Sequence, residues 1–446
     1  MSYMSQESRS CLGPVTGIIA EYNPFHNGHA FHIQEAKRLC NASCCVVVMS
    51  GDFVQRGEPA IFDKYARTFM ALSSGADLVV EMPPAFALAS AEDFAACGVA
   101  LLESMGIVSH LCFGSECGRI APLMDLARIL ALEPEPFRET LRREAASGLS
   151  YPKARQKALA QYLASRQMST DPASLLSSPN NTLGVEYLKA LLKQDSPIIP
   201  VTIARQGAGY HDQCLSAEYS SATAIRKRIF ELYQCREHNT ARHGVPAPDA
   251  PGQNAPDWAL QTQVPSSCLE TIRTAVPVCT DDFSLLLSYR LLELSQQAAG
   301  LDGFADVSPE LALRIARHTL NFSSFEERIA DIKTRQYTYT RISRCLMHIL
   351  LNITRANMDS RKRLGYGAYL RILGFRRDSA PLLGEIKRCS RLPIVTKTAD
   401  APRILSPQAL ESFNHDLFCS HMYQSVVQQK TCMRPKNEYT RSLVIV

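Results

Sequence analysis

The amino-acid sequence predicts an α/β protein whose first half forms a mostly parallel sheet and whose second half is mainly α-helical. Three observations support this prediction. Short apolar runs alternate with helical patterns over the first half, polar loops containing glycine follow several of the apolar runs, and helical patterns dominate the second half. Strands that alternate with helices form parallel sheets with right-handed crossovers.

The strands of the first half are predicted from short apolar runs and its helices from apolar residues at helical spacing. The strands are Val15–Ala20, Cys44–Met49, Ala76–Glu81, Val108–Phe113 and Ile198–Ile203. The helices are Ala30–Leu39, Asp63–Ser73 and Ala91–Ser104, then a mostly helical stretch over Pro122–Leu192 and a helix that opens at Ser221.

The second half is predicted to be a series of helices. They are Ser266–Thr274, Asp281–Gln297, Pro309–Leu320, Phe325–Lys333 and Thr340–Thr354. A short strand within Ala368–Phe375 and a helix at Ser379–Arg388 follow. Pro402–Val446 has little periodicity, and we expect a tail that packs loosely on the body.

The length of 446 residues allows two or three domains. We expect a disordered extension over 1–14, an α/β domain over 15–233, a linker or insertion rich in Pro, Asn, Ala and Gly over 234–263, and a mainly helical domain over 264–446. A composition of 46% hydrophobic and 20% charged residues is that of a soluble globular protein. No apolar run is long enough to span a membrane, and residues 1–14 lack the apolar core of a secretion signal. We therefore expect a cytoplasmic protein.

The 15 cysteines do not form a disulfide or zinc pattern. Their number is odd, they are scattered, and none forms a Cys-x-x-Cys pair. Several lie inside apolar runs, such as Cys44 and Cys97. This usage is typical of reduced thiols in a protein core.

The loop after the first predicted strand is the most distinctive feature. It reads Glu21-Tyr22-Asn23-Pro24-Phe25-His26-Asn27-Gly28-His29, and a helix begins directly behind it. A helix start offers free N–H groups and a positive dipole end to a phosphate, and imidazoles can donate hydrogen bonds to phosphate oxygens. The residue types favour a phosphate site, while an ordinary polar helix start and a metal-binding histidine pair stay open. A metal would need further ligands, which no nearby motif supplies.

Three further loops could complete a site with these histidines. Ser50–Pro59 is a polar loop with glycines and an arginine, Gly114 follows a buried strand, and Ser221 and Thr223 stand at a helix start. Each by itself is equally typical of a plain connection, a tight turn or an ordinary N-cap. Because ligands of parallel sheets bind at the carboxyl ends of the strands, we expect the first two loops to converge with His26 on one edge.

Positive charge is concentrated late in the chain. Between Asp331 and Ser390 there are 13 lysines and arginines against 4 aspartates and glutamates, whereas the whole chain has a net charge of only +5. Tyrosines are interleaved with these cations. Cations bind phosphates and aromatic rings stack on unpaired bases. A nucleic-acid surface and an ordinary solvated helical face are equally compatible with this pattern.

These strings together resemble a known family. The His-x-Gly-His core is similar to the signature of the nucleotidyltransferase superfamily, and the loop from Glu21 to His29 resembles the bacterial tRNA(Met) cytidine acetate ligases in particular. Asn23 stands where many other members of the superfamily carry Asp. Further matching strings are Gln55–Pro59, Phe113–Glu116, Pro179–Asn181, Thr202–Arg205, Ser221–Arg226 and Tyr337–Arg341. The resemblance covers nearly the whole chain after Pro14, apart from 234–263.

The resemblance implies a Rossmann-like nucleotidyltransferase domain that binds ATP, with His26 and His29 as the catalytic residues. The residues implied in ATP binding are Ile19, Ala20, Glu21, Tyr22, Asn23, Pro24, Phe25, His26, Asn27, Gly28, His29, Ala30, Phe31, His32, Gly114, Asn180, Arg205, Ser221, Thr223 and Arg226. Mg²⁺ is expected together with the ATP phosphates, and no metal ligand is predicted in the protein.

The resemblance also favours tRNA as the partner of the late basic region. The candidate RNA-binding residues are Lys333, Arg335, Tyr337, Tyr339, Arg341, Arg344, Arg361, Lys362, Arg363 and Arg371. Acetate is the implied small substrate, and we expect neither a membrane nor an obligate protein partner.

The implied reaction is acetylation of the wobble cytidine of elongator tRNA(Met) to N4-acetylcytidine through an acetyl-adenylate. Two alternatives remain open at this point. One is a nucleotidyltransferase that joins AMP or CMP to a small phosphorylated metabolite, although such enzymes are usually shorter and need no basic second half. The other is an RNA-binding protein with an inactive nucleotide site.

Overall fold

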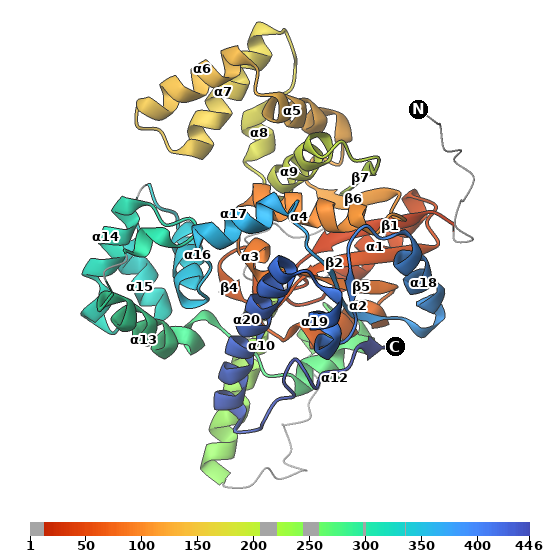
Figure 1. Ribbon diagram of the computed structural model, residues 1–446, viewed down its shortest axis with the longest axis vertical. Helices are drawn as coiled ribbons and strands as arrows, with labels where there is room; N and C mark the ends of the chain where they lie inside the picture. Colours follow the sequence, from red (N-terminus) through yellow and green to blue (C-terminus); the bar gives the residue numbers. More distant parts are fainter. Residues whose placement is uncertain (1–12, 206–220, 244–257, 298–299, 335) are drawn as a thin grey trace.

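A central β-sheet organises the molecule (Figure 1). The computed structural model describes residues 13–205, 221–243, 258–297, 300–334 and 336–446. Within these residues the sheet has eight strands in the order β10-β8-β5-β2-β1-β6-β7, with β9 beside β8. They are β1 Val15–Ala20, β2 Cys44–Ser50, β5 Leu78–Met82, β6 His110–Ser115, β7 Ile199–Ala204, β8 Leu370–Phe375, β9 Ile394–Val395 and β10 Val444–Ile445. A separate hairpin joins β3 Phe53–Val54 to β4 Glu58–Pro59.

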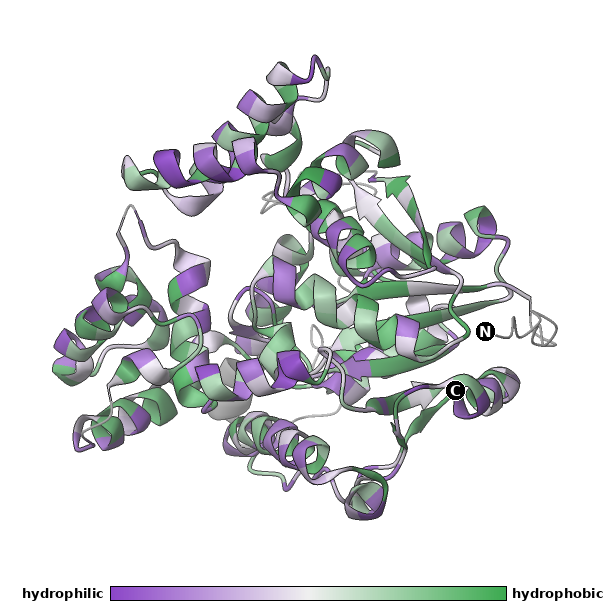
Figure 2. Cartoon of the chain, turned by 45° about the horizontal axis from the view of Figure 1, so that its top comes forward, coloured by the Kyte–Doolittle hydropathy of each residue, from purple (hydrophilic) through white to green (hydrophobic). Residues whose placement is uncertain are grey.

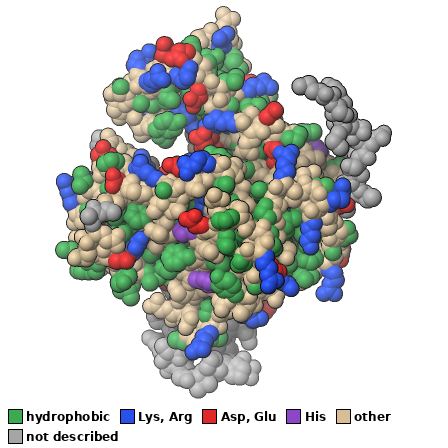
Figure 3. Space-filling view, in the orientation of Figure 1, with side chains coloured by type: hydrophobic (Ala, Val, Ile, Leu, Met, Phe, Trp, Pro, Cys, Tyr) green, Lys and Arg blue, Asp and Glu red, His purple; other side chains and the backbone are tan. Residues whose placement is uncertain are grey.

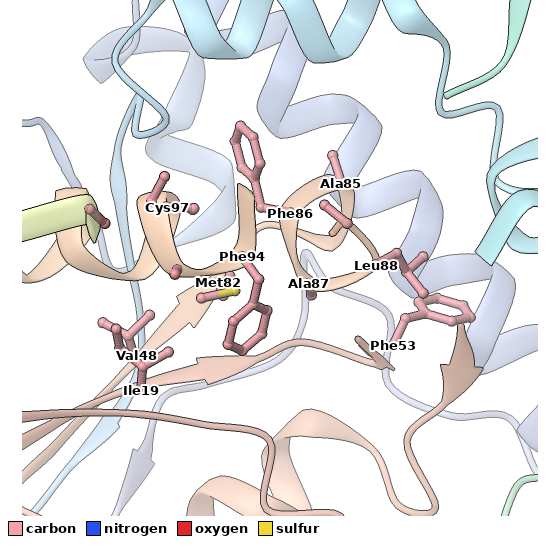
Figure 4. Packing of buried hydrophobic residues seen from close by; sticks show 14 of the residues in the cluster. Ile19, Val48, Phe53, Met82, Ala85, Phe86, Ala87, Leu88, Phe94 and Cys97 are labelled. Carbon is pink, nitrogen blue, oxygen red and sulfur yellow. The ribbon is translucent and has the colours of Figure 1, made fainter. Parts of the chain in front are cut away.

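The sheet is parallel except where β5 pairs with β8. β2 is buried along its whole length, as expected for a strand covered by helices on both faces. Neighbouring residues of β1 point to opposite faces, so Ile18 packs with Ile33 of α1 while Ile19 packs beneath α4 with Phe94 (Figure 4). The predicted α/β architecture is confirmed.

Helices cover both faces of the sheet and form two further lobes. The helices of the first half are α1 Asn27–Leu39, α2 Lys64–Ser73, α3 Pro84–Ala87, α4 Ala91–Ser104, α5 Ile120–Leu132, α6 Glu135–Ala146, α7 Tyr151–Ser165, α8 Pro172–Leu176, α9 Pro179–Lys193 and α10 Ala222–His243. The later helices are α11 Trp258–Gln261, α12 Ser266–Thr274, α13 Ser284–Ser295, α14 Pro309–Arg317, α15 Phe325–Ile332, α16 Tyr339–Leu350, α17 Arg355–Arg363, α18 Ala380–Cys389, α19 Ala401–Ile404 and α20 Pro407–Thr431. Figure 2 shows the apolar residues gathered in the strands and on the inner sides of the helices.

The two lobes lie on either side of a hollow. One lobe contains α5 to α8 and the other contains α13 to α16 (Figure 1). The space-filling view shows the hollow between them, with Lys and Arg side chains on both sides (Figure 3). The lobes are thus separate surfaces attached to one α/β core.

Local signals explain where several helices begin. Asp63 Oδ1 accepts a hydrogen bond from the backbone N–H of Ala66 at the start of α2, and Ser90 Oγ accepts one from Asp93 at the start of α4. These side chains satisfy N–H groups that have no partner within the helix. The predicted boundaries of α4 and α12 match the structure.

The last part of the chain differs from its prediction. Residues 407–431 were expected in a loose tail but form the long helix α20, whose Phe413 and Tyr423 are buried. The prediction was wrong because polar residues of α20 are buried too, among them Asp416 and Gln424. Their positions interrupt the apolar periodicity by which an amphipathic helix is recognised.

The predicted linker and the predicted extension lie partly outside the described residues. Within 234–263, α10 continues to His243 and α11 occupies 258–261, while 244–257 lies outside the described part. Residues 1–12 of the expected extension also lie outside it.

Two further observations concern the whole described chain. Its cysteines are all free thiols, most of them buried, as their scattered positions predict. Across the described residues, no helix is both long enough and apolar enough to cross a membrane.

Candidate active site

A cavity of about 470 Å³ lies at the carboxyl ends of β1, β6 and β7. The starts of α1, α9 and α10 and the loop after β2 complete its wall. This is the edge at which parallel sheets bind ligands, and the volume is in the range of small-molecule sites. The predicted site residues that line it are Ile19, Ala20, Glu21, Tyr22, Asn23, His26, Gly28, His29, Phe31, His32, Gly114, Asn180, Arg205, Ser221, Thr223 and Arg226.

The other residues of the predicted stretch support the cavity from behind. They are Pro24, Phe25, Asn27 and Ala30. Phe25 is buried and packs edge-on against Tyr22, with ring centroids 4.8 Å apart. Asn27 donates hydrogen bonds to two backbone carbonyls, from its N–H to Gln263 at 2.9 Å and from Nδ2 to Thr262 at 2.8 Å. The loop is thereby fixed on the core and on the segment before α12.

The imidazole rings of His26 and His29 are stacked, with centroids 3.8 Å apart. Nδ1 of His26 accepts a hydrogen bond from the backbone N–H of Gly28 at 3.1 Å, and Nδ1 of His29 accepts one from the backbone N–H of His26 at 3.3 Å. A nitrogen that accepts does not carry the proton of a neutral imidazole, so both rings carry it on Nε2. Each histidine therefore offers one N–H donor to a ligand in the cavity.

Burial keeps the imidazoles of this site neutral. Burial, together with the smaller effect of the nearby charges of Arg205 and Arg226, lowers the pKa of His26 to about 3. Burial also lowers the pKa of His29 well below its usual value and that of His32 to about 4. At neutral pH these side chains are hydrogen-bond donors and not cations. The positive charge for an anion comes from the arginines and the helix ends.

The start of α10 is tied to the histidine loop. Ser221 Oγ accepts a hydrogen bond from the backbone N–H of Ala224 at 3.1 Å and so caps the helix. Arg226 donates from Nη1 to the backbone oxygen of Asn23 at 2.8 Å and from Nη2 to Thr223 Oγ1 at 3.3 Å. Two helix N-termini, those of α1 and α10, therefore face one cavity. Such a pair can hold the phosphates of a polyphosphate chain.

The far side of the cavity is built around Glu116. Its Oε1 accepts a hydrogen bond from Asn180 Nδ2 at 2.7 Å, and its Oε2 accepts one from the backbone N–H of Asn181 at 2.8 Å. The carboxylate thus caps α9 and orients Asn180 at the same time. Gly114 lies next to Arg205, whose Cγ would be 3.5 Å from a Cβ at Gly114. The predicted residues from β6, α9 and β7 thus meet on one side.

The loop after β2 connects the cavity to the helical lobe. The backbone N–H of Gln55 donates to Glu21 Oε1 at 2.8 Å, and Arg56 also lines the cavity. Gly57 has a φ of +83°, and its backbone oxygen accepts a hydrogen bond from Ser343 Oγ of α16 at 2.7 Å. One short loop therefore contacts both the cavity and α16.

Several residues of the cavity wall were not predicted. They are Ala91, Phe94, Thr182, Leu183 and Tyr187. All of them lie inside helices, where an apolar residue is indistinguishable from ordinary core. Only the three-dimensional arrangement identifies them.

The candidate RNA-binding residues divide into buried and accessible ones. Arg361 is buried and pairs with Asp416 at 2.8 Å. Arg371 is also buried and pairs with Glu81 and Glu438. Both guanidinium groups stabilise the interior, and neither can reach a nucleic acid at the surface.

The remaining candidates lie nearer to the surface. Lys362 pairs with Asp93, Arg344 pairs with Asp306, and Tyr339 is half-buried. Lys333 and Arg363 are exposed, whereas Arg335 lies outside the described residues. Arg341 lies over the ring of Tyr337, 5.1 Å from its centroid. A shallow groove at this place is lined by Glu310, Leu313, Arg314, Arg317, Thr334, Gln336 and Tyr337. Of the residues that line this groove, only Tyr337 was among the candidate RNA-binding residues predicted from the sequence.

Comparison with known proteins identifies the family. The model of the family described as HIGH Nucleotidyl Transferase matches residues 14–438. A tRNA(Met) cytidine acetate ligase of Acetivibrio thermocellus is 38% identical, over 97% of this chain and 100% of the relative. This chain belongs to the tRNA(Met) cytidine acetate ligase family. A second member, from Halothermothrix orenii, is 36% identical over 96% of this chain and 98% of its own length.

Solved structures of the ligase family have the same fold. The apo form of Thermotoga maritima TmcAL matches with a TM-score of 0.84 and 29% identity, over 97% of this chain and 100% of that one. A second structure of TmcAL, bound with alpha-thio ATP, matches equally well at 28% identity. The resemblance deduced from the histidine loop is thus confirmed, and the second TmcAL structure holds an ATP analogue.

Proposed function

We propose that this protein acetylates the wobble cytidine of elongator tRNA(Met), using ATP and acetate and releasing pyrophosphate and AMP. The observation that carries the proposal is the pair of imidazole Nε2–H donors of His26 and His29, which line a cavity between two helix N-termini. The family supports the identity of the acceptor, because relatives that match along almost their whole length are named tRNA(Met) cytidine acetate ligase.

Two half-reactions are needed because acetate does not react with an amine by itself. An acetate oxygen first attacks the α-phosphorus of ATP and displaces pyrophosphate, which gives acetyl-adenylate. The exocyclic amine of cytidine then attacks the acetyl carbon and displaces AMP. The first half-reaction needs no proton acceptor, since acetate is already ionised, so positioning and charge stabilisation account for most of its acceleration.

The geometry supports specific roles in the first half-reaction. The Nε2–H groups of His26 and His29 would donate to the phosphate oxygens, whose charge grows as acetate attacks. Ser221, Thr223 and Arg226 at the start of α10 would hold the departing pyrophosphate. Asn180 and Arg205 would contact the nucleoside on the opposite wall.

Mg²⁺ would enter with the ATP. Within the described residues, no group of three or more His, Cys, Asp or Glu side chains is placed to hold a metal ion. Mg²⁺ commonly binds through the phosphates of its substrate. Its role would be to offset the negative charge of the phosphate chain, while the protein orients that chain.

The groove beside Tyr337 supports an RNA-binding role for the helical lobe. Arg314 and Arg317 line this groove together with the half-buried Tyr337, Arg341 lies over the tyrosine ring, and Lys333 is exposed. Cations beside an aromatic ring fit phosphates and unpaired bases. The protein would meet tRNA in the cytoplasm.

The proposal is tested by ATP–pyrophosphate exchange with and without acetate, for wild type and His29→Ala. Exchange that requires acetate and is lost in the variant supports carboxylate activation at this cavity. His110→Ala is a matched control, because His110 lies at the amino end of β6, on the opposite edge of the sheet. The acceptor is then tested by digesting reacted tRNA(Met) and measuring N4-acetylcytidine. Exchange that depends on a phosphate ester instead of acetate would contradict the proposal.

A further inference from the structure

The cavity has a second side, which faces α4 and α9 and is mostly apolar. Residues of β1 alternate between the two faces of the sheet, and Ile19 lies against Gly98 of α4. Glu21 lies two residues beyond Ile19, which places it on the same side. Phe94 of α4 and Tyr187 of α9 line the cavity there. This side therefore combines one carboxylate with the edges of two aromatic side chains.

The carboxylate of Glu21 is held in one place. Its Oε1 accepts the hydrogen bond from the backbone N–H of Gln55 at 2.8 Å, whereas Oε2 has no hydrogen-bond partner among the described residues. Burial raises the pKa of the Tyr187 hydroxyl, and the charge of Glu21 adds to this rise. Burial also raises the pKa of Glu21, and the charge of Glu58 adds to this rise. The hydrogen bond from Gln55 and the charges of Arg56 and Arg226 act in the opposite direction, but they do not cancel the rise. A carboxylate in this setting is a stronger proton acceptor than one in water.

The second half-reaction requires a proton acceptor. When the N4 amine of cytidine bonds to the acetyl carbon, the nitrogen becomes positively charged and must lose a proton before AMP leaves. His26 and His29 cannot accept it readily, because their Nδ1 atoms already bind backbone N–H groups and their Nε2 atoms carry protons. His32 keeps a free Nε2, but that atom is enclosed by protein and burial lowers the pKa of the ring to about 4.

Glu21 is the remaining acceptor. Among the described residues that line the cavity it is the only carboxylate. A carboxylate is also the side chain that pairs with the N4 amine of cytosine in protein–nucleic acid complexes.

We propose that Glu21 accepts the proton of the cytidine N4 amine during acetyl transfer, an inference that rests on the proposed function. The amine nitrogen forms a bond to the acetyl carbon, and the proton passes from nitrogen to Oε2 of Glu21. The tetrahedral intermediate then collapses, the bond between the acetyl carbon and the phosphate oxygen breaks, and AMP leaves with that electron pair. The products are N4-acetylcytidine, AMP and one proton, which Glu21 returns to solvent.

The test separates the two half-reactions in Glu21→Gln. The glutamine keeps the size of the side chain and an oxygen that can accept from Gln55, but it cannot take a proton. The rate of acetyl transfer from preformed acetyl-adenylate to tRNA, measured in a single turnover, should fall about 10²- to 10⁴-fold. The acetate-dependent exchange rate of Glu21→Gln should fall much less, by a factor at least ten times smaller than the fall in its transfer rate. In wild type the transfer rate should rise with pH through the titration of Glu21, and Glu21→Gln should lose this rise.

Glu35→Gln is the matched control, because Glu35 is a carboxylate of α1 that pairs with Arg38 and does not line the cavity. Its replacement should leave both the acetate-dependent exchange rate and the single-turnover transfer rate as in wild type. Glu21→Asp, which keeps a carboxylate, should recover part of the transfer rate and its rise with pH.

Equal losses in both half-reactions of Glu21→Gln would overturn the inference and assign Glu21 to nucleotide binding. A transfer rate in Glu21→Gln equal to that of wild type would overturn it as well. Failure of the proposed function has a different signature, namely no acetate-dependent exchange in the wild-type protein.

Discussion

The ammonium group of Lys64 lies 3.1 Å from Glu438 Oε2, in the interior of the protein and 374 positions away along the chain. Lys64 also lies 2.8 Å from Glu81 Oε1 and 3.7 Å from Asp52 Oδ2, and its side chain has no exposed surface. Burial alone would raise the pKa of Glu438, but Lys64 and Arg371 outweigh this effect and lower it to about 2. Charges from both ends of the chain are therefore neutralised in one buried cluster.

Replacement of Lys64 should destabilise the fold strongly. Among the described residues, Lys64→Met leaves Asp52 without its ion pair and leaves Glu81 and Glu438 paired with Arg371 alone. Breaking a buried ion pair costs roughly 3–5 kcal/mol. The free energy of unfolding, measured in urea, should fall by that amount. Lys193→Met is the control, because Lys193 pairs with Glu92 at the surface, where ion pairs contribute little. Equal stability of the two variants would contradict this prediction.

Gly57→Ala should slow adenylation because it displaces a loop of the site, and not because it unfolds the protein. A Cβ at Gly57 would lie 2.4 Å from the backbone nitrogen of Arg344, so the loop that carries Gln55 and Arg56 must shift. A displacement of catalytic or binding groups by about 1 Å can lower a reaction rate about 10²-fold. Gly148→Ala is the control, since Gly148 has a similar φ of +87° and no atom within 4 Å of the added methyl group. Acetate-dependent exchange should decrease in Gly57→Ala only.

Acid should destabilise the protein through the histidines of the site. An unfolded histidine has a pKa near 6.5, whereas the folded protein holds the pKa of His26 at about 3 and that of His32 at about 4. Between these values the unfolded chain binds more protons, so stability decreases as the pH falls from about 6.5 towards 4. The midpoint of thermal unfolding should fall over this range, and less so in His32→Gln. An identical pH dependence in the variant would contradict the assignment.

The groove beside Tyr337 should contribute to tRNA affinity and not to adenylation. Arg317→Ala and Lys333→Ala should each weaken tRNA binding and reduce the slope of log K against log salt by about 0.7–0.9 for each phosphate that the variant no longer binds. Exchange without tRNA should stay as in wild type. Arg403→Ala removes an exposed arginine on α19 and should change neither quantity. Unchanged tRNA affinity in the groove variants would place the RNA on another surface.

The sequence was most informative where the signal is local. The loop from Glu21 to His29 has a fixed order of residues, and α4 has its cap and its apolar face within fifteen positions, so both were predictable. Arg361 and Arg371 were indistinguishable from surface cations, because their partners Asp416 and Glu438 lie more than fifty positions away. Phe94 lines the cavity because α4 packs on β1. This packing joins distant parts of the chain, so it cannot be predicted from the residues around Phe94 in the sequence.

The antiparallel strand β8 has a consequence for synthesis of the chain. β8 covers the edge of β5, but its residues 370–375 follow β5 by nearly three hundred positions. A nascent chain that has just left the ribosome with β1, β2 and β5 therefore exposes an unpaired strand edge until Leu370 to Phe375 emerge. Exposed edges of this kind promote pairing with other chains. During translation, this edge of β5 would be a site for chaperones or for aggregation.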